Sequence, residues 1–129
     1  MDAIGAAVEV LGDRWSLLIL RDVIFEDRRH FRALLLGSAE GIASNILADR
    51  LVRLVEAGLL ARGTAARGQR ARYSLTEAGI QTVPVLVALG DWGAEWRAGE
   101  PQPISDGFLD ELRARHAQPR RDRGSEGST

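Results

Sequence analysis

The chain has 129 residues, of which 45% are apolar and 27% charged, and its 17 basic and 18 acidic side chains give a net charge of −1. This composition predicts one compact soluble domain, and there is no run of about 18 apolar residues that would span a membrane. Residues 1–5 lack the basic stretch and apolar core of a secretory signal, so we expect a cytoplasmic protein. The absence of cysteine excludes disulfides, thiolate metal sites and cysteine nucleophiles. Only two histidines are present, His30 and His116, and they lie far apart in the sequence, so we expect no metal and no cofactor.

The charge is unevenly distributed along the chain. Residues 28–72 contain nine arginines and three acids, a local charge of +6, whereas the remainder carries −7. Every basic residue is arginine, which suits bidentate contacts to phosphate and guanine but also fits GC-rich codon usage. A basic central segment in an otherwise acidic chain predicts a polyanionic partner for one side of the protein.

The first two predicted elements are helices. Apolar residues at helical spacing predict a short helix over residues 3–11 that ends at Gly12. Asp13 is a suitable N-cap for a second helix over residues 14–24. This second helix is apolar nearly all round, so we expect it at the centre of the core.

A short third helix over residues 30–36 and a fourth over residues 43–57 follow. The turn between them, residues 37–41, contains two glycines, which disfavour helix. Gly58 is well placed to end the fourth helix as a left-handed C-cap. Two helices joined by a short glycine-containing turn are the components of a helix-turn-helix.

The pattern changes after Gly58. Residues 59–62 and 71–75 predict two short strands around a long polar loop, which together make a β-hairpin. A hairpin that directly follows a helix-turn-helix is the wing of a winged helix. The predicted fold class is therefore mainly α with a small β-hairpin (α+β), a winged helix-turn-helix over residues 1–98.

The remainder of the chain is predicted to be mostly helical. Thr76 is expected to cap a helix over residues 77–96, which Pro84 must kink or split because its ring removes a backbone hydrogen bond. Residues 99–117 are expected to form a linker and a short amphipathic helix, with its acids on an exposed face. Residues 118–129 contain no aliphatic or aromatic side chain, so we expect a disordered tail.

The fourth helix offers a candidate recognition surface. Its leucines gather on one face, and the opposite face is polar. A major groove admits one helix, from which an amide can pair with adenine, a carboxylate with cytosine, and a guanidinium with guanine or phosphate. A solvated amphipathic face is the simpler explanation for an isolated helix, but the adjoining arginine-rich hairpin favours DNA. The candidate contacts are Ser44, Asn45, Asp49, Arg50 and Arg53.

The loop of the hairpin is the candidate wing. Residues 62–72 include four arginines and no acid, as contact with phosphates or a minor groove requires. The start of the third helix can add phosphate contacts, although a polar turn is an equally good explanation there. The candidates are Arg67, Gln69 and Arg70 in the loop, with Arg29 and Arg32 at the third helix.

Dimerisation is expected from the apolar first and last helices. A core this small cannot cover all of their apolar faces in a monomer, and a homodimer would present two recognition helices to a pseudo-palindromic duplex. Trp15 is most simply a core residue, and Trp92 and Trp96 share one helix face. A weaker alternative is a ligand-gated form, in which a small apolar effector binds near Trp15, Trp92, Trp96 and the dimer interface.

Catalytic motifs are missing from the sequence. Neither histidine lies in a pattern typical of a catalytic triad, and no phosphate-binding glycine loop is present. We therefore expect no enzyme. A winged helix that docks onto another protein instead of DNA is the remaining alternative, which the arginine-rich loop disfavours.

Several segments, in order, resemble the HxlR-type winged helix-turn-helix transcriptional regulators. The strongest are W-S-L-L-I-L-R-D at residues 15–22 and A-L-G-D-W-G at residues 88–93, with L-A-D-R-L-V-R-L-V-E-A-G-L-L at residues 47–60 and Y-S-L-T-E-A-G at residues 73–79 between them. The resemblance covers about residues 5–96. It implies a homodimeric bacterial regulator with its recognition helix at 43–57 and its wing at 62–72.

Two departures from that family pattern matter. Some members sense oxidants through a cysteine near the N-terminus, which this chain lacks. Many members begin the recognition helix with Gly-Ile-Ser, where this chain has Gly41-Ile42-Ala43. We therefore expect Ser44 to serve as the N-cap, which would shift the start of the helix by one residue.

Overall fold

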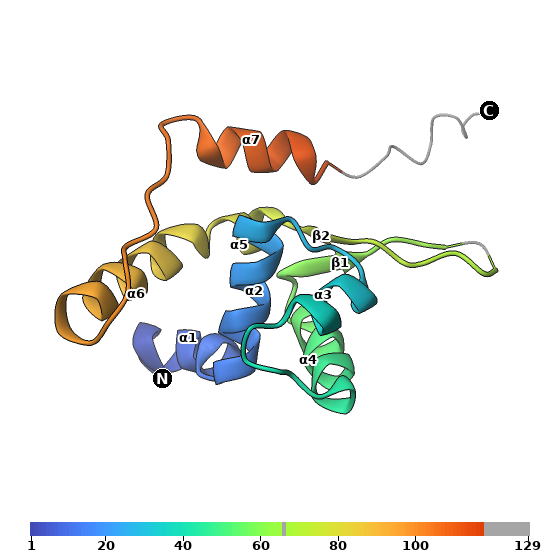
Figure 1. The fold of residues 1–129 in the computed structure, drawn as a ribbon, viewed down its shortest axis with the longest axis horizontal. Coiled ribbons are helices and arrows are strands. Elements are labelled where there is room, and N and C mark those ends of the chain that lie inside the picture. The colour runs from blue at the N-terminus through green and yellow to red at the C-terminus, as the bar shows by residue number, and fades with distance from the viewer. Residues whose placement is uncertain (66, 118–129) are drawn as a thin grey trace.

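The computed structural model describes residues 1–65 and 67–117 (Figure 1). Its helices and strands, in chain order, are α1 (Ala3–Leu11), α2 (Arg14–Glu26), α3 (Phe31–Gly37), α4 (Ser44–Glu56), β1 (Leu60–Arg62), β2 (Tyr73–Leu75), α5 (Glu77–Ile80), α6 (Val83–Trp96) and α7 (Phe108–Arg115). A mainly helical chain with a two-stranded antiparallel hairpin after α4 confirms the predicted winged helix-turn-helix. The predicted disorder of residues 118–129 lies outside the described residues.

Helix α2 lies at the centre of the core. The carboxylate of Asp13 caps it by accepting a hydrogen bond from the Ser16 amide at 2.8 Å, as the sequence predicts. One side of α2 packs against apolar side chains of α4 and of the hairpin and is removed from solvent. The fully buried members are Leu20, Val23 and Ile24 of α2, Leu47, Leu51 and Leu54 of α4, and Leu60 of β1.

The start of α4 differs from the prediction. Ala43 is the N-cap residue and makes no side-chain cap, and Ser44 is the first residue inside the helix, so the expectation that Ser44 caps α4 is wrong. The preceding turn is fixed in another way, because the Ser38 hydroxyl accepts a hydrogen bond from the Ile42 amide at 3.0 Å. Ile42 is itself buried, which anchors the turn to the core before the helix begins.

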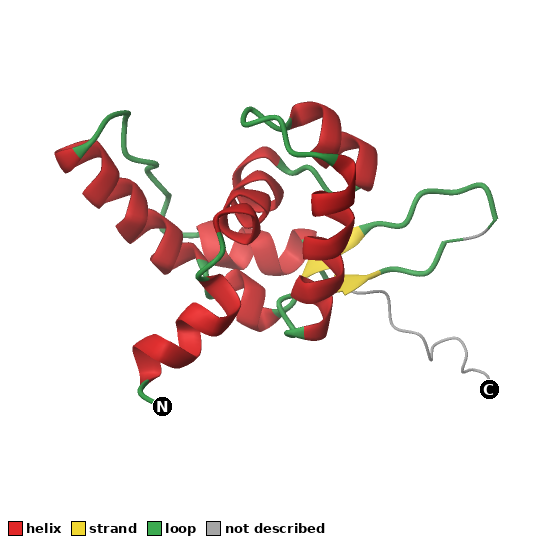
Figure 2. Cartoon of the chain, turned by 90° about the horizontal axis from the view of Figure 1, so that it is seen from below, coloured by secondary structure: helices red, strands yellow, loops and turns green. Residues whose placement is uncertain are grey.

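The hairpin leaves the body as a wing. Strands β1 and β2 pair with Leu60 opposite Leu75 and Arg62 opposite Tyr73. The intervening loop extends well beyond the helices in two perpendicular views (Figures 1 and 2). The segment before α3 joins the base of the wing, since the Tyr73 amide donates to the Arg29 carbonyl at 2.8 Å. The wing and the helix-turn-helix are therefore one connected unit.

The predicted interruption of the long helix at Pro84 is confirmed as a split into α5 and α6. Thr76 caps α5 by accepting from the Gly79 amide at 3.1 Å. Pro84 lies in the first turn of α6, where its missing N–H has no helical partner to lose. Within the described part of the chain, no helix is long and apolar enough to cross a membrane.

Helix α7 is amphipathic as expected: its acids Asp110 and Glu111 are exposed, and its apolar side packs back onto the core. Leu112 is fully buried, and the Phe108 ring stacks on Phe25 of α2 with centroids 5.7 Å apart. At the end of the helix, buried His116 accepts a hydrogen bond from the Leu75 amide at 2.9 Å. The apolar side of this short helix therefore packs on α2 and β2. The sequence of the helix alone does not indicate these contacts.

Candidate nucleic-acid interface

One face of α4 is open to solvent along its whole length. Ser44, Asn45, Asp49 and Arg53 all lie on it, and these are four of the five helix residues predicted to contact DNA. The same face exposes Val52, whose side chain has no covering element. The leucines on the opposite side hold the helix to α2, so the polar face is presented outward.

Ion pairs organise the charged part of this face. The Asp49 carboxylate accepts from Arg50 Nη1 at 2.8 Å and lies 3.1 Å from Arg53 Nε. Both guanidiniums contact Oδ2, which makes this oxygen a weaker acceptor for a base amino group. Arg53 keeps most of its side chain in solvent and can reach a phosphate.

The fifth predicted helix contact, Arg50, is directed toward the protein. Its Nε and Nη2 atoms bind the two carboxylate oxygens of Asp13 at 2.9 and 3.1 Å, a bidentate pair. The hydrogen bond from Arg50 lowers the pKa of Asp13 to about 2, and Asp13 in turn raises the pKa of Arg50. Arg50 therefore ties the middle of α4 to the first turn of α2.

The wing presents exposed cations and an amide. Arg67, Gln69 and Arg70 are exposed around Gly68, whose backbone φ of 80° lies in the left-handed region. None of the wing arginines has a carboxylate within salt-bridge distance in residues 1–65 and 67–117. This tip is thus a cationic surface that the rest of the described chain does not neutralise.

Arg29, predicted to contact phosphate, is instead buried with 5% of its surface exposed, so that prediction is wrong. Its guanidinium donates to the Tyr73 carbonyl at 2.9 Å, to the Ser74 hydroxyl at 2.6 Å and to the Arg115 carbonyl at 3.0 Å. Burial lowers the pKa of Arg29. The hairpin and the end of α7 cover this position, whereas Arg32, one turn later, is exposed as expected.

A second ion pair, which no sequence pattern predicts, fixes the helix-turn-helix. Arg21 of α2 binds both carboxylate oxygens of Glu40 at 2.8 Å, and its Nε donates to Asp22 at 2.9 Å. Glu40 lies in the turn between α3 and α4, and the hydrogen bond from Arg21 lowers the pKa of Glu40. The two partners are 19 residues apart, so no local spacing rule points to this contact.

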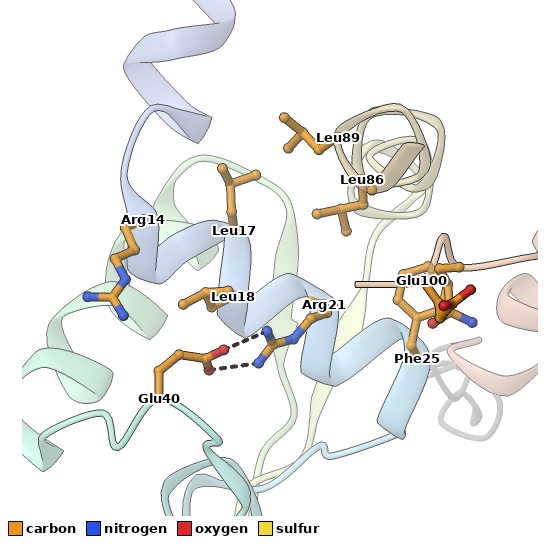
Figure 3. Close-up of a pocket in the computed structure, with 11 residues that line it drawn as sticks. Arg14, Leu17, Leu18, Arg21, Phe25, Glu40, Leu86, Leu89 and Glu100 are labelled. Atoms are coloured by element: carbon orange, nitrogen blue, oxygen red, sulfur yellow. Dashed lines mark hydrogen bonds and ion pairs between the residues drawn. The ribbon is translucent and has the colours of Figure 1, made fainter. Parts of the chain in front are cut away.

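The three tryptophans predicted to line an effector site do not form one pocket. Trp92 and Trp96 of α6 are 59% and 67% exposed, and Trp92 borders an open apolar depression on that helix. Trp15 packs against the core beneath Arg14, whose guanidinium carbon is 4.5 Å from the ring centroid. A separate cavity of about 550 Å³ lies between α2 and α6, and no tryptophan lines it (Figure 3).

Comparison with known sequences now decides the family. Residues 10–101 match the model of the family described as HxlR-like helix-turn-helix. The chain belongs to this family. Its relatives include an uncharacterized HTH-type transcriptional regulator of Mycobacterium tuberculosis (strain ATCC 25618 / H37Rv), 40% identical over 96 residues, which are 74% of this chain and 59% of the relative. Another, from Synechocystis sp. (strain ATCC 27184 / PCC 6803 / Kazusa), is 33% identical over 90 residues, 69% of this chain and 65% of the relative.

This HxlR-like chain thus spans about three fifths of the length of the mycobacterial relative. Among solved structures, the candidate transcription factor PA1607 aligns with a TM-score of 0.67 and 34% identity over 79% of this chain and 80% of its own. The redox regulator HypR in its reduced form aligns with a TM-score of 0.66 at 22% identity over 74% of this chain and 94% of its own. At that identity the second match establishes the fold alone. Both agree with the predicted winged helix-turn-helix, and the relatives are named as regulators of transcription, not as enzymes.

Proposed function

We propose that this HxlR-like protein is a sequence-specific DNA-binding regulator of transcription. Helix α4 enters the major groove, and the wing lies on neighbouring phosphates or in a minor groove. The observation that carries this proposal is the pairing of an exposed polar helix face with an exposed arginine-bearing wing on one connected unit. Such a role places the protein in the cytoplasm, with double-stranded DNA as its partner.

The N-terminal turn of α4 is the part best suited to read bases. Asn45 is exposed there, and its amide can pair with adenine. Because Ala43 provides no side-chain cap, the first N–H groups of α4 remain free to donate to a phosphate. Arg53 and Arg32 are the exposed cations on either side that can hold the backbone of the duplex.

A homodimer completes the proposal. Helix α1 exposes Ile4 and Val8 at 75% and 57%, and α6 exposes Trp92 and Trp96. Apolar side chains gathered on two neighbouring helices mark an interaction surface, and a second copy is the partner that the apolar faces of α1 and α6 fit. A two-fold axis through these helices would place two α4 helices on half-sites about one turn of DNA apart.

Selection of duplexes from a random pool, followed by anisotropy titration of the selected site, tests the proposal. We expect a pseudo-palindromic site, tighter binding than to a scrambled duplex of equal length, and an affinity that falls steeply as salt rises. Equal affinity for both duplexes, or no binding at low salt, would refute a sequence-specific regulator.

Asn45→Ala tests the reading helix within the same assay. Loss of an amide that pairs with a base should reduce the preference for the selected site about tenfold while changing non-specific binding little. Gln81→Ala removes an exposed amide from the end of α5 and is the matched control, expected to leave the preference unchanged. An unaltered preference in Asn45→Ala would remove this residue from the interface.

A further inference from the structure

The cavity between α2 and α6 is built from elements that the proposed function uses. Apolar side chains of both helices form its walls, Leu17, Leu18 and Phe25 from α2 with Leu86 and Leu89 from α6 (Figure 3). Its volume of about 550 Å³ lies within the range of about 300–1,000 Å³ typical of small-ligand sites. One wall belongs to the helix proposed to dimerise and the other to the helix that supports the recognition helix.

One end of the cavity holds a guanidinium that is not paired with an acid. Arg14 and Arg21 of α2 and Glu40 of the α3–α4 turn lie together there (Figure 3). Arg21 is paired with Glu40 and, through Nε, with Asp22 outside the cavity, but Arg14 has no carboxylate within salt-bridge distance in the part of the chain that the structure describes. Glu100 lines the cavity away from this end, so it does not pair with Arg14 (Figure 3).

We propose that this cavity binds a small organic monocarboxylate with an apolar body, and that binding of this ligand lowers the affinity of the protein for DNA. The apolar body occupies the leucine and phenylalanine walls, and the carboxylate lies against Arg14 and Arg21. The regulatory part of this inference rests on the proposed DNA-binding function, whereas ligand binding itself does not.

Arg21 connects the cavity to the recognition helix. The ligand carboxylate competes with Glu40 for the Arg21 guanidinium, because Glu40 occupies Nη1 and Nη2 and Asp22 occupies Nε. Glu40 precedes α4 by a few residues, and α4 has no side-chain cap to hold its first turn. Release of Glu40 therefore loosens the turn that sets the position of the reading residues.

Isothermal titration of the full chain with 4-phenylbutyrate, in the absence of DNA, tests the site. The matched probes 4-phenylbutan-1-ol and 4-phenylbutylamine have the same apolar body without the negative charge. We expect the acid to bind about tenfold more tightly than the alcohol and the amine to bind least, since a charge-assisted contact to arginine is lost or reversed. Equal affinity of acid and alcohol, or no heat from any of the three at millimolar concentration, would overturn the proposal.

Three variants separate the parts of the site. Arg14→Gln should weaken binding of the acid about fivefold and leave the alcohol unchanged. Gly90→Leu should abolish binding of both, because a Cβ at Gly90 meets only the Gln102 backbone nitrogen at 3.9 Å and the added side chain fills the cavity. Glu40→Gln frees Arg21, so it should bind the acid more tightly and bind DNA more weakly without any probe.

Anisotropy titration with the selected duplex completes the test. Saturating 4-phenylbutyrate should lower the DNA affinity of the wild type severalfold and leave Gly90→Leu unaffected. Probe binding that survives in Gly90→Leu would place the ligand elsewhere and overturn the proposal. If a second copy of the chain filled the cavity instead, probe affinity would fall as protein concentration rises. Failure to bind any duplex would refute the proposed function alone, since the calorimetric result does not depend on DNA.

Discussion

Asp13 serves two elements with one carboxylate. One oxygen caps α2 through the Ser16 amide, and both oxygens bind the Arg50 guanidinium from α4. The side chain is half-buried, so the pair is less screened than a fully exposed one. We therefore interpret Arg50 as a positioning residue that sets how α4 lies on α2, and not as a direct DNA contact.

Asp13→Asn should lower the free energy of unfolding by about 1 kcal/mol, because asparagine still caps a helix but loses the charge-assisted pair with Arg50. Urea denaturation followed by tryptophan fluorescence measures this change in the free energy of unfolding. Asp2→Asn is the matched control, since Asp2 caps α1 through the Gly5 amide and has no arginine partner in residues 1–65 and 67–117. Because the pKa of Asp13 is lowered to about 2, the wild-type advantage should persist above pH 4 and disappear as the pH falls through about 2. An equal loss in both variants would contradict this role.

His116 makes the docking of α7 sensitive to acid. Burial, together with nearby Arg29, lowers the pKa of His116 to about 4, and its Nδ1 accepts from the Leu75 amide, which requires the neutral ring. Since the unfolded chain binds a proton near pH 6.5, the stabilising effect is complete above that pH and lost as the pH falls toward 4.

The free energy of unfolding should therefore drop by about 1–2 kcal/mol between pH 7.5 and pH 5 through this residue. His116→Asn retains an acceptor near the Nδ1 position and does not titrate, so that part of the pH dependence should vanish. Urea midpoints of both proteins across this range provide the measurement. Parallel pH profiles of wild type and variant would show that His116 is not responsible.

At the scale of elements, we expect the wing and α4 to make different contributions to DNA binding. The wing carries arginines free of acidic partners in the described chain, whereas the arginines of α4 are paired with Asp13 and Asp49. Contact through free cations releases counterions without sequence preference, so the wing should supply affinity and α4 should supply specificity.

The double variant Arg67→Gln/Arg70→Gln should weaken binding to selected and scrambled duplexes alike, about tenfold or more at moderate salt. It should also lower the slope of log K against log salt by about two, one for each lost phosphate contact. Arg97→Gln, an exposed arginine beyond the end of α6, is the control and should change neither value. Arg50→Gln should leave the slope of log K against log salt unchanged. A decrease of about one in the slope of this variant would show that Arg50 contacts a phosphate.

At the scale of the molecule, the exposed apolar side chains of α1 and α6 remain to be covered. Against the described part of the chain, helix α1 has no fully buried residue, although most of its residues are apolar. A helix with that composition gains little by folding alone, and a second copy supplies the missing contact.

Trp92→Arg should convert a dimer to a monomer in sedimentation velocity and reduce affinity for a pseudo-palindromic duplex at least tenfold, because a charge would enter the apolar interface. Trp92 is 59% exposed in the single chain, so the fold should tolerate the change. Leu36→Arg, at a 70% exposed position on α3, is the matched control and should sediment as wild type does. A dimer that persists in Trp92→Arg would exclude this face of α6 as the interface.

The signals that predicted the fold were local. Asp13 as a cap, the left-handed Gly58 after α4 and the break at Pro84 each depend on a few neighbouring residues, and the structure confirms all three. The family motifs and helical periodicity extended the same information over α2 and α4. For the candidate site, periodicity identified the exposed face of α4, and the absence of acids identified the wing.

The sequence by itself determined the winged helix-turn-helix, because helical periodicity, caps and turns act over short separations. Only the tertiary structure decided the roles of individual arginines, which the chain alone presents as equivalent. Arg29 is buried under β2 and α7, Arg50 is held by Asp13, and Arg21 is held by Glu40, whereas Arg67 and Arg70 have no acidic partner among the described residues. The groups that bind each guanidinium are distant from it in sequence. Whether an arginine is available for DNA or for a ligand therefore depends on packing between elements.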